Sequence, residues 1–285
     1  MFRNIATGFR IAAQNKKMIG IVYLINVLFG LLMMLPWRAA ISSFGGHSLL
    51  MRNMGGAFNM DFLFDLAIHH PTFLSIWITV IAAGLLLYQL VQLFLSGGIF
   101  SVYLGDGVYD PTAFWGSASR YFWRFVRLAL WSLLILGLFV GIVFAFKELQ
   151  RLIWGKHPYE TVLYWNKVFR IVLLQFLLML YAMILDYSRM VIIRDDVRRS
   201  RRALLAGIRF VQQQFWPALG IALSFFILTG LTLLMYNIVA DVLKSPSIVV
   251  IVLLFFWQQA YMLTRLVLRL SLYGAESALF RTRSG

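Results

Sequence analysis

This chain of 285 residues contains no cysteine, only 6 prolines and few charged residues, which make up 13% of its length. The lack of cysteine excludes disulfide bonds and thiolate metal sites. Acidic residues are scarce as well, because 11 aspartates and glutamates stand against 26 lysines and arginines. The resulting net charge of +15 favours anionic partners over cationic ones.

The familiar enzyme signatures are also missing. The sequence has no HExxH motif, no glycine-rich phosphate loop, no nucleophile elbow and no pair of carboxylates within one apolar run. A zinc site needs three or four convergent ligands, and the spacing of the connector histidines and acids predicts no such convergence. These connector residues are His47, Asp61, Asp65, His69, His70, His157 and Glu160. We therefore expect a protein that is not an enzyme and holds no metal or cofactor.

Six long apolar runs dominate the sequence, and 61% of all residues are hydrophobic. About 20 apolar residues in a helix are enough to cross a hydrocarbon core of about 30 Å. The sequence therefore predicts an all-α, polytopic membrane protein with a single domain, residues 1–285. We expect Pro36 to close the first span, and the pair Gly97 and Gly98 to bend or end the second. The expected spans cover about residues 18–35, 73–103, 128–146, 171–193, 217–240 and 248–270.

The distribution of lysine and arginine predicts the orientation of the spans. Basic connectors are retained on the cytoplasmic side during insertion. One side would hold both termini, the second-to-third connector and the fourth-to-fifth connector, and it collects 18 of the 26 basic residues. The densest block follows the fourth span, in the segment RDDVRRSRR that starts at Arg194. We therefore expect both termini in the cytoplasm.

A short basic amphipathic segment precedes each of the three outward-going spans, at intervals of roughly a hundred residues. In the second segment Arg120, Arg124 and Arg127 form one stripe of a helix. Gly8-Phe9-Arg10 in the first segment matches Gly207-Ile208-Arg209 in the third. In the returning spans, Ser188-Arg189 matches Thr264-Arg265. Three copies of one helical unit would explain these similarities. The alternative is six unrelated spans with basic flanks.

Several polar residues inside the apolar runs form a candidate site. Asp186 and Arg189 are three residues apart on one helix, so they can pair, either as a structural lock or as part of a polar pocket. If the second, fourth and sixth spans converge, their polar residues would line a basic chamber suited to a phosphate or carboxylate. Alternatively, the glutamines bond between helices and the arginines reach the interface. The candidate ligand- or lipid-binding residues are Asp186, Arg189, Arg265, Arg269, Gln89, Gln92, Gln258 and Gln259.

The basic amphipathic segments suggest contact with the membrane surface. Helices with arginine on one face and Phe, Trp or Leu on the other lie in the headgroup layer and are attracted to anionic lipid. Nucleic-acid binding explains these charges less well, because membrane topology already requires them where they are. The candidate interfacial residues are Arg120, Arg124, Arg127, Arg194, Arg198, Arg202 and Arg209.

Two stretches of the chain carry a resemblance to known proteins. FLSGGIFSVYLGDG is followed by ASRYFWRFVRLAL, and LDYSRMVIIRDDVRRSRRALLAGIRF comes later. The pattern, best over residues 85–215, resembles uncharacterised bacterial six-helix inner-membrane proteins. It is also similar to the membrane domain that accompanies some glycerophosphodiester phosphodiesterases. The resemblance implies a helical bundle in a bacterial inner membrane and transfers no catalytic residue.

Together these patterns predict a non-catalytic protein of the cytoplasmic membrane. It would act through contact with anionic lipid or as an integral subunit of a membrane assembly, with other subunits as partners. The alternative is a small transporter or permease component with an inward-facing basic pocket, since transporters often bind their substrates between repeats.

Overall fold

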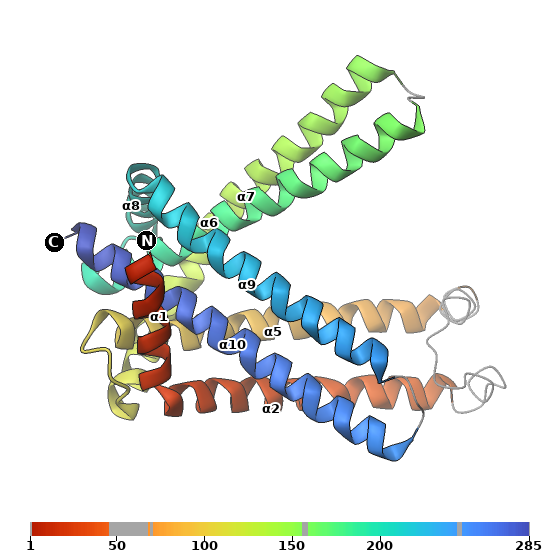
Figure 1. The fold of residues 1–285 in the computed structure, drawn as a ribbon, viewed down its shortest axis with the longest axis horizontal. Helices are drawn as coiled ribbons and strands as arrows, with labels where there is room; N and C mark the ends of the chain where they lie inside the picture. The colour runs from red at the N-terminus through yellow and green to blue at the C-terminus, as the bar shows by residue number, and fades with distance from the viewer. Residues whose placement is uncertain (1, 46–67, 69–70, 156–158, 244–246, 285) are drawn as a thin grey trace. The chain divides into compact units, whose positions relative to one another are not determined.

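The computed structural model describes residues 2–45, 68, 71–155, 159–243 and 247–284, and nearly all of them are helical (Figure 1). Eight helices follow one another in these ranges, which contain no β-strand. The helices are α1 (Phe2–Gln14), α2 (Lys16–Gly45), α5 (Pro71–Leu104), α6 (Pro111–Trp154), α7 (Glu160–Arg194), α8 (Ser200–Gln213), α9 (Phe215–Val242) and α10 (Ile248–Ser284). The expectation of an all-α fold is confirmed for the described ranges.

Six of these helices, α2, α5, α6, α7, α9 and α10, are long and apolar enough to cross a membrane. Each of the six spans expected from the sequence lies within one of them. The number and the positions of the apolar helices are therefore confirmed. The connector residues His47, Asp61, Asp65, His69, His70 and His157 lie outside the described residues.

The ends of several helices differ from the expectation. Pro36 does not close the first helix, because α2 continues past it to Gly45. Gly97 and Gly98 do not end α5 either, since this helix runs on to Leu104. A Cβ on Gly97 would lie 3.1 Å from the Ala118 Cα, so this glycine allows a close approach of α6.

Two helices are much longer than their predicted spans. Helix α6 begins at Pro111 and includes the basic stripe and the third span in one continuous helix. Helix α10 has 37 residues and continues beyond Leu270 to Ser284. At 1.5 Å per residue α10 is about 55 Å long, well beyond the roughly 30 Å of a hydrocarbon core. Its C-terminal part is therefore available to build structure outside the apolar layer.

Local chemistry explains where α6 begins and ends. Asp110 has an extended backbone, and its carboxylate accepts a hydrogen bond from the Ala113 amide at 2.9 Å. Pro111 occupies the first turn, where its missing N–H removes no intrahelical hydrogen bond. At the other end Gly155 takes a φ of 76°, which a side-chain-bearing residue rarely adopts.

The chain divides into two compact units, residues 1–19 with 94–285 and residues 20–93. In the second unit α2 and α5 form an antiparallel pair. Gln92 Nε2 donates to Asn26 Oδ1 at 2.7 Å, and the rings of Phe29 and Tyr88 lie 5.2 Å apart one turn further along. The helices approach closely at Gly84, since a Cβ there would meet the Met33 sulfur.

In the first unit α6 pairs with α7, and α9 pairs with α10 (Figure 1). The Ser132 and Tyr181 hydroxyls form a 2.8 Å hydrogen bond between α6 and α7. In the second pair the Tyr236 and Tyr261 rings stack at 4.7 Å. Both pairs are antiparallel hairpins, so in the first unit the C-terminal ends of α7 and α10 lie at the same end as the starts of α6 and α9.

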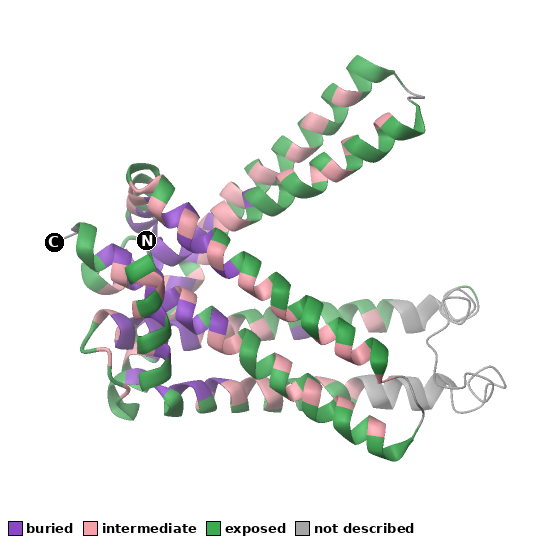
Figure 2. Ribbon diagram, viewed as in Figure 1, coloured by how far each residue is buried: buried purple, intermediate pink, exposed green. Residues whose placement is uncertain are grey.

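The core of the first unit gathers at this end (Figure 2). Most of the basic residues of the first unit lie at the same end. Tyr103 of α5, Phe125 of α6, Tyr187 of α7 and Phe280 of α10 are all fully buried there. Arg281 ties α10 to α5, because its guanidinium donates to the Tyr103 and Gly105 carbonyl oxygens. These carbonyls lie at and just beyond the end of α5, where the last carbonyl groups of a helix have no intrahelical partner.

Large apolar side chains cover the outer halves of the long helices and remain exposed. On α6, Leu134 is 66% and Phe144 62% exposed. In water, exposed apolar area costs about 25 cal/mol per Å². A continuous apolar surface of this kind marks contact with lipid or a partner. Lipid as the surrounding medium removes that cost.

Candidate functional site

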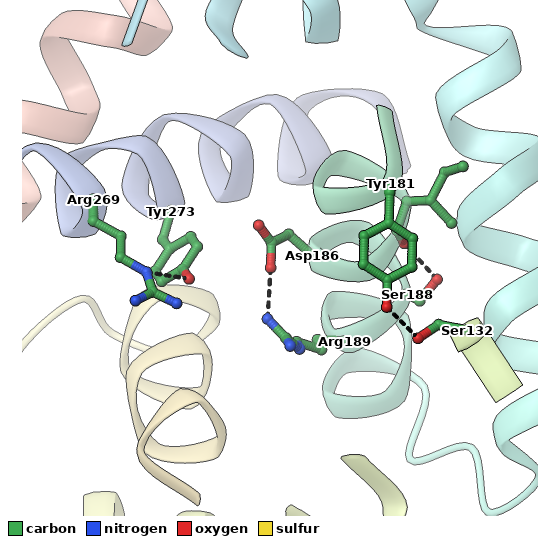
Figure 3. Close-up of polar contacts among 8 residues, drawn as sticks. Ser132, Tyr181, Asp186, Ser188, Arg189, Arg269 and Tyr273 are labelled. Carbon is green, nitrogen blue, oxygen red and sulfur yellow. Dashed lines mark hydrogen bonds and ion pairs between the residues drawn. The ribbon is translucent and has the colours of Figure 1, made fainter. Parts of the chain in front are cut away.

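The expected ion pair between Asp186 and Arg189 is present on α7 (Figure 3). Arg189 Nη1 donates to Asp186 Oδ1 at 2.7 Å, and the residues are only 8% and 6% exposed. The guanidinium carbon of Arg189 also lies 6.0 Å from the Phe125 ring centroid. The pair is thus enclosed by the core of the first unit rather than open to solvent.

Helix α10 adds a second cation beside this pair (Figure 3). Arg269 Nε donates to the Tyr273 hydroxyl at 2.9 Å, and its guanidinium carbon lies 5.6 Å from the Tyr273 ring centroid. Arg269 also interacts electrostatically with Asp186 across the two helices. The structure therefore brings together three of the expected site residues, Asp186, Arg189 and Arg269.

Glu276 of α10 belongs to the same cluster, and the sequence analysis missed it. It is 1% exposed and interacts electrostatically with Asp186 and Arg189. Its Oε2 atom has no hydrogen-bond partner among the described residues. Glu276 lies beyond the predicted sixth span, which ends at about residue 270. The spacing of Tyr273, Glu276 and Phe280 on one helical face was the available signal.

The other expected pocket residues are not gathered around the ion pair within the first unit. Arg265 and Gln258 are exposed on α10, and Gln259 is half-buried there. Gln92 is hydrogen-bonded to Asn26, and Gln89 is exposed. Both glutamines lie in the second unit. A chamber lined by glutamines from α5 together with α7 and α10 stays a prediction.

Two of the expected interfacial arginines form ion pairs within the protein. Arg120 and Arg124 bind Asp196, which follows α7, at 3.0 and 2.5 Å. The hydrogen bond from Arg124, followed by the charges of the two arginines, lowers the pKa of Asp196 below its ordinary value. These arginines therefore fasten the start of α6 to the connector between α7 and α8.

The remaining basic residues at this end are exposed. Arg194 pairs with Asp195 at 2.7 Å and lies over the Phe280 ring at 4.6 Å. Arg127 donates from Nε to the Trp123 carbonyl oxygen at 3.3 Å. The expected interfacial residues Arg198, Arg202 and Arg209, on or next to α8, are exposed, as are Arg199 and Arg201.

Helices α1 and α8 each present one face to the core of the first unit. α1 buries Gly8 and Ala12, and α8 buries Ala203, Gly207 and Val211 among others. Gly207 lies against Ser188 on α7, whose hydroxyl donates to the Ile184 carbonyl oxygen at 2.6 Å. The small residues Gly8 and Gly207 allow α1 and α8 to pack closely against their neighbouring helices.

Comparison of the chain with protein-family models, with curated proteins and with solved structures finds no match. The resemblance drawn from residues 85–215 therefore stays a prediction. The described part of the chain also contains no group of three histidines or acids close enough to hold a metal ion.

Proposed function

We propose that this chain is a multi-pass protein of the bacterial cytoplasmic membrane that lacks catalytic activity and acts through contact with anionic lipid. It does so alone or as an integral subunit of a membrane assembly. Six apolar helices and their exposed outer surfaces support the membrane setting. The lipid contact is assigned to the basic end of the first unit.

The single observation that carries this proposal is that exposed tryptophans and arginines occur together at that end. Trp123 on α6 is 68% exposed, and Trp216 at the start of α9 is 78% exposed. The Arg127 side chain is hydrogen-bonded to the Trp123 carbonyl oxygen, and Arg209 of α8 precedes Trp216 of α9 by seven residues in the sequence. Tryptophan favours the membrane interface, where its ring meets headgroups and acyl chains. Guanidiniums at this level face lipid phosphates.

Helix α8 is built for such a surface. Its exposed residues Arg202, Leu205 and Arg209 are spaced three and four apart and so share one face. The opposite face is buried through Ala203 and Gly207. A helix fixed to the core along one side and presenting arginine and leucine on the other can lie in the headgroup layer. Each basic residue near an anionic surface contributes about 1 kcal/mol.

We place this basic end, with both termini, in the cytoplasm. The asymmetry of lysine and arginine supports the orientation, because 18 of the 26 basic residues belong to this end. Anionic lipid on the cytoplasmic leaflet then faces α1, α8 and the start of α6.

A threefold internal repeat is part of the proposal, and three close helix crossings support it. In each crossing a basic segment meets a returning helix at small residues. α1 meets α10 where a Cβ on Gly274 would lie 3.0 Å from the Gly8 Cα, and α8 meets α7 at Gly207. The start of α6 meets α5 at Gly97 and Ala118. Each basic segment thus crosses the returning helix of another of the three repeats.

The sequence supports the same alignment. An arginine follows the small residue of each basic segment by two positions: Arg10 after Gly8, Arg120 after Ala118 and Arg209 after Gly207. Gly207 of α8 contacts Ser188 of α7, and the matching Gly8 of α1 contacts Gly274 of α10, so the crossings align Ser188 with Gly274. The sequence comparison aligned Ser188 with Thr264 instead, so the crossings favour a different alignment of the returning helices.

The alternative function is transport through a basic pocket. A substrate site needs a path for its ligand, whereas Asp186, Arg189 and Glu276 are buried by protein. Burial of the ion pair supports a structural lock for the cluster and favours lipid contact over transport.

Anionic lipid that binds the folded state must raise the unfolding temperature of the protein. The test is thermal unfolding in nanodiscs with rising fractions of phosphatidylglycerol in phosphatidylcholine. We expect the wild-type temperature to rise with the anionic fraction, and the variant Arg198→Gln/Arg202→Gln/Arg209→Gln to lose most of that rise.

The matched control is Lys147→Gln/Lys167→Gln/Arg170→Gln, which removes the same charge from the opposite ends of α6 and α7 and keeps the rise. Lipid contact at the basic end would be contradicted if the unfolding temperature rose equally with the anionic fraction in the two triple variants. It would also be contradicted if the wild-type temperature did not rise at all.

A further inference from the structure

Arg265 is an exposed cation on the apolar part of α10. It makes no hydrogen bond or ion pair with the described part of the chain. Arg269, one turn further along, is also exposed on the same face. An arginine guanidinium remains protonated in proteins. An unpaired charge in hydrocarbon is costly, so Arg265 needs a counter-ion.

The acids nearby are already engaged with other cations. Asp186 is paired with Arg189 and interacts with Arg269, and Glu276 interacts with Asp186 and Arg189. No described acid is paired with Arg265, so its positive charge is unmatched within the described residues. A ligand with a single negative charge would neutralise it.

The position of α1 sets the depth of Arg265. α1 crosses α10 at Gly274 and packs on α9, where Phe9 stacks on Phe225 at 5.4 Å. At 1.5 Å per residue, Arg269 and Arg265 lie about 8 and 14 Å from this crossing along α10, toward the apolar part. With α1 in the headgroup layer, both guanidiniums are within reach of lipid phosphates on their flexible side chains.

The surface beyond Arg265 is apolar and suits acyl chains. Met262, Leu263 and Phe255 are exposed on α10. Met262 and Leu263 lie within one turn of Arg265 on α10, on the side away from the crossing with α1. The exposed Leu231 and Ile227 of α9 extend the same surface, since α9 and α10 form one hairpin. A soluble anion has no acyl chains and would not contact this apolar surface.

We propose that Arg265 and Arg269 form a binding site for one phospholipid of the inner leaflet. Its headgroup carries a phosphate without a balancing ammonium group, and its acyl chains lie along α9 and α10. This site rests on the proposed lipid contact but is separate from the surface of α8. The two guanidiniums bind the phosphate by charge-assisted hydrogen bonds, and the lipid neutralises the charge of Arg265.

The test is native mass spectrometry of the full chain released from detergent with added phosphatidylglycerol or phosphatidylethanolamine. We expect the wild-type protein to retain one phosphatidylglycerol at low lipid concentration and to prefer it over phosphatidylethanolamine. Arg265→Gln should weaken this binding about tenfold, the loss of roughly one charged hydrogen bond. Arg265→Lys should restore part of it. Arg265 has no described partner in the protein, so its replacement leaves the fold intact.

The control Arg202→Gln removes the same charge from α8 and should keep the retained lipid. Equal retention by the wild type and Arg265→Gln overturns the proposal, as does inorganic phosphate that binds the detergent-solubilised protein and displaces the lipid. The proposed function is tested separately by the nanodisc unfolding temperatures. Equal dependence of the unfolding temperature on anionic lipid in the two triple variants, together with a retained, Arg265-dependent lipid, would reject the surface contact of α8 and keep this site.

Discussion

Gly8 of α1 and Gly274 of α10 lie in backbone contact, because a Cβ on Gly274 would come within 3.0 Å of the Gly8 Cα. This crossing joins the first helix of the chain to the last. It also positions α1 beside Phe225 of α9, where Phe9 stacks. The contact therefore links three helices at the basic end of the first unit.

Replacing Gly274 by leucine should separate α1 from α10. Forcing a side chain into a packed contact costs about 1–3 kcal/mol, more than the gain of up to about 1 kcal/mol in helix propensity. We expect a lower free energy of unfolding in detergent and faster proteolysis of α1. Gly141→Leu is the control, because a Cβ at Gly141 meets nothing within 4 Å. If both variants unfold alike, the crossing is not a stabilising contact.

Removing one member of the buried pair Asp186 and Arg189 should destabilise the protein strongly. The partner left behind is an uncompensated buried charge, and breaking such a pair costs about 3–5 kcal/mol. Asp186→Leu and Arg189→Met should each lower the free energy of unfolding by about this amount. The double variant should recover much of the loss, because two apolar groups replace both charges. Additive losses in this double-mutant cycle would show that the two residues act independently.

The ion pairs of Asp196 with Arg120 and Arg124 should make stability depend on pH in the acid range. The pKa of Asp196 is lowered on folding, chiefly by the Arg124 hydrogen bond. Its contribution is therefore fully present above the ordinary value of 3.8 and is lost as the pH falls through the lower folded value. The difference in unfolding temperature between the wild type and Asp196→Asn should be constant near neutral pH and vanish in strong acid.

The same comparison with Asp106→Asn, in the connector between α5 and α6, provides the control. A wild-type to Asp196→Asn difference that grows as the pH falls would have the wrong sign for this ion pair.

The apolar runs were enough to predict the six long helices, because length and hydropathy alone decide whether a segment can cross lipid. Their ends could not be predicted in the same way. The sequence predicts a bend or an end of the helix at Gly97, yet this residue lies inside α5, where Ala118 packs against it. Pro36 also looked like an end, but a proline is tolerated in apolar helices when its surroundings satisfy the freed carbonyl.

The candidate site could be predicted only in part. The pairing of Asp186 with Arg189 follows from helical spacing. Glu276 joins the cluster because α10 continues past residue 270 and packs one face into the core. The apolar run ends before this part of the helix and so does not predict it. The role of Arg120 and Arg124 depends on Asp196, more than seventy residues away, so tertiary structure decides it.

The central claim is that the chain crosses a membrane with its basic end in the cytoplasm. The absence of cysteine allows single cysteines to be introduced without background. Thr282→Cys at the end of α10 and Thr161→Cys at the start of α7 both place an exposed thiol at the end of an apolar helix. A membrane-impermeant maleimide should label Thr161→Cys in intact cells and Thr282→Cys only in inverted vesicles. Labelling of Thr282→Cys in intact cells, or recovery of the chain in the soluble fraction, would contradict the claim.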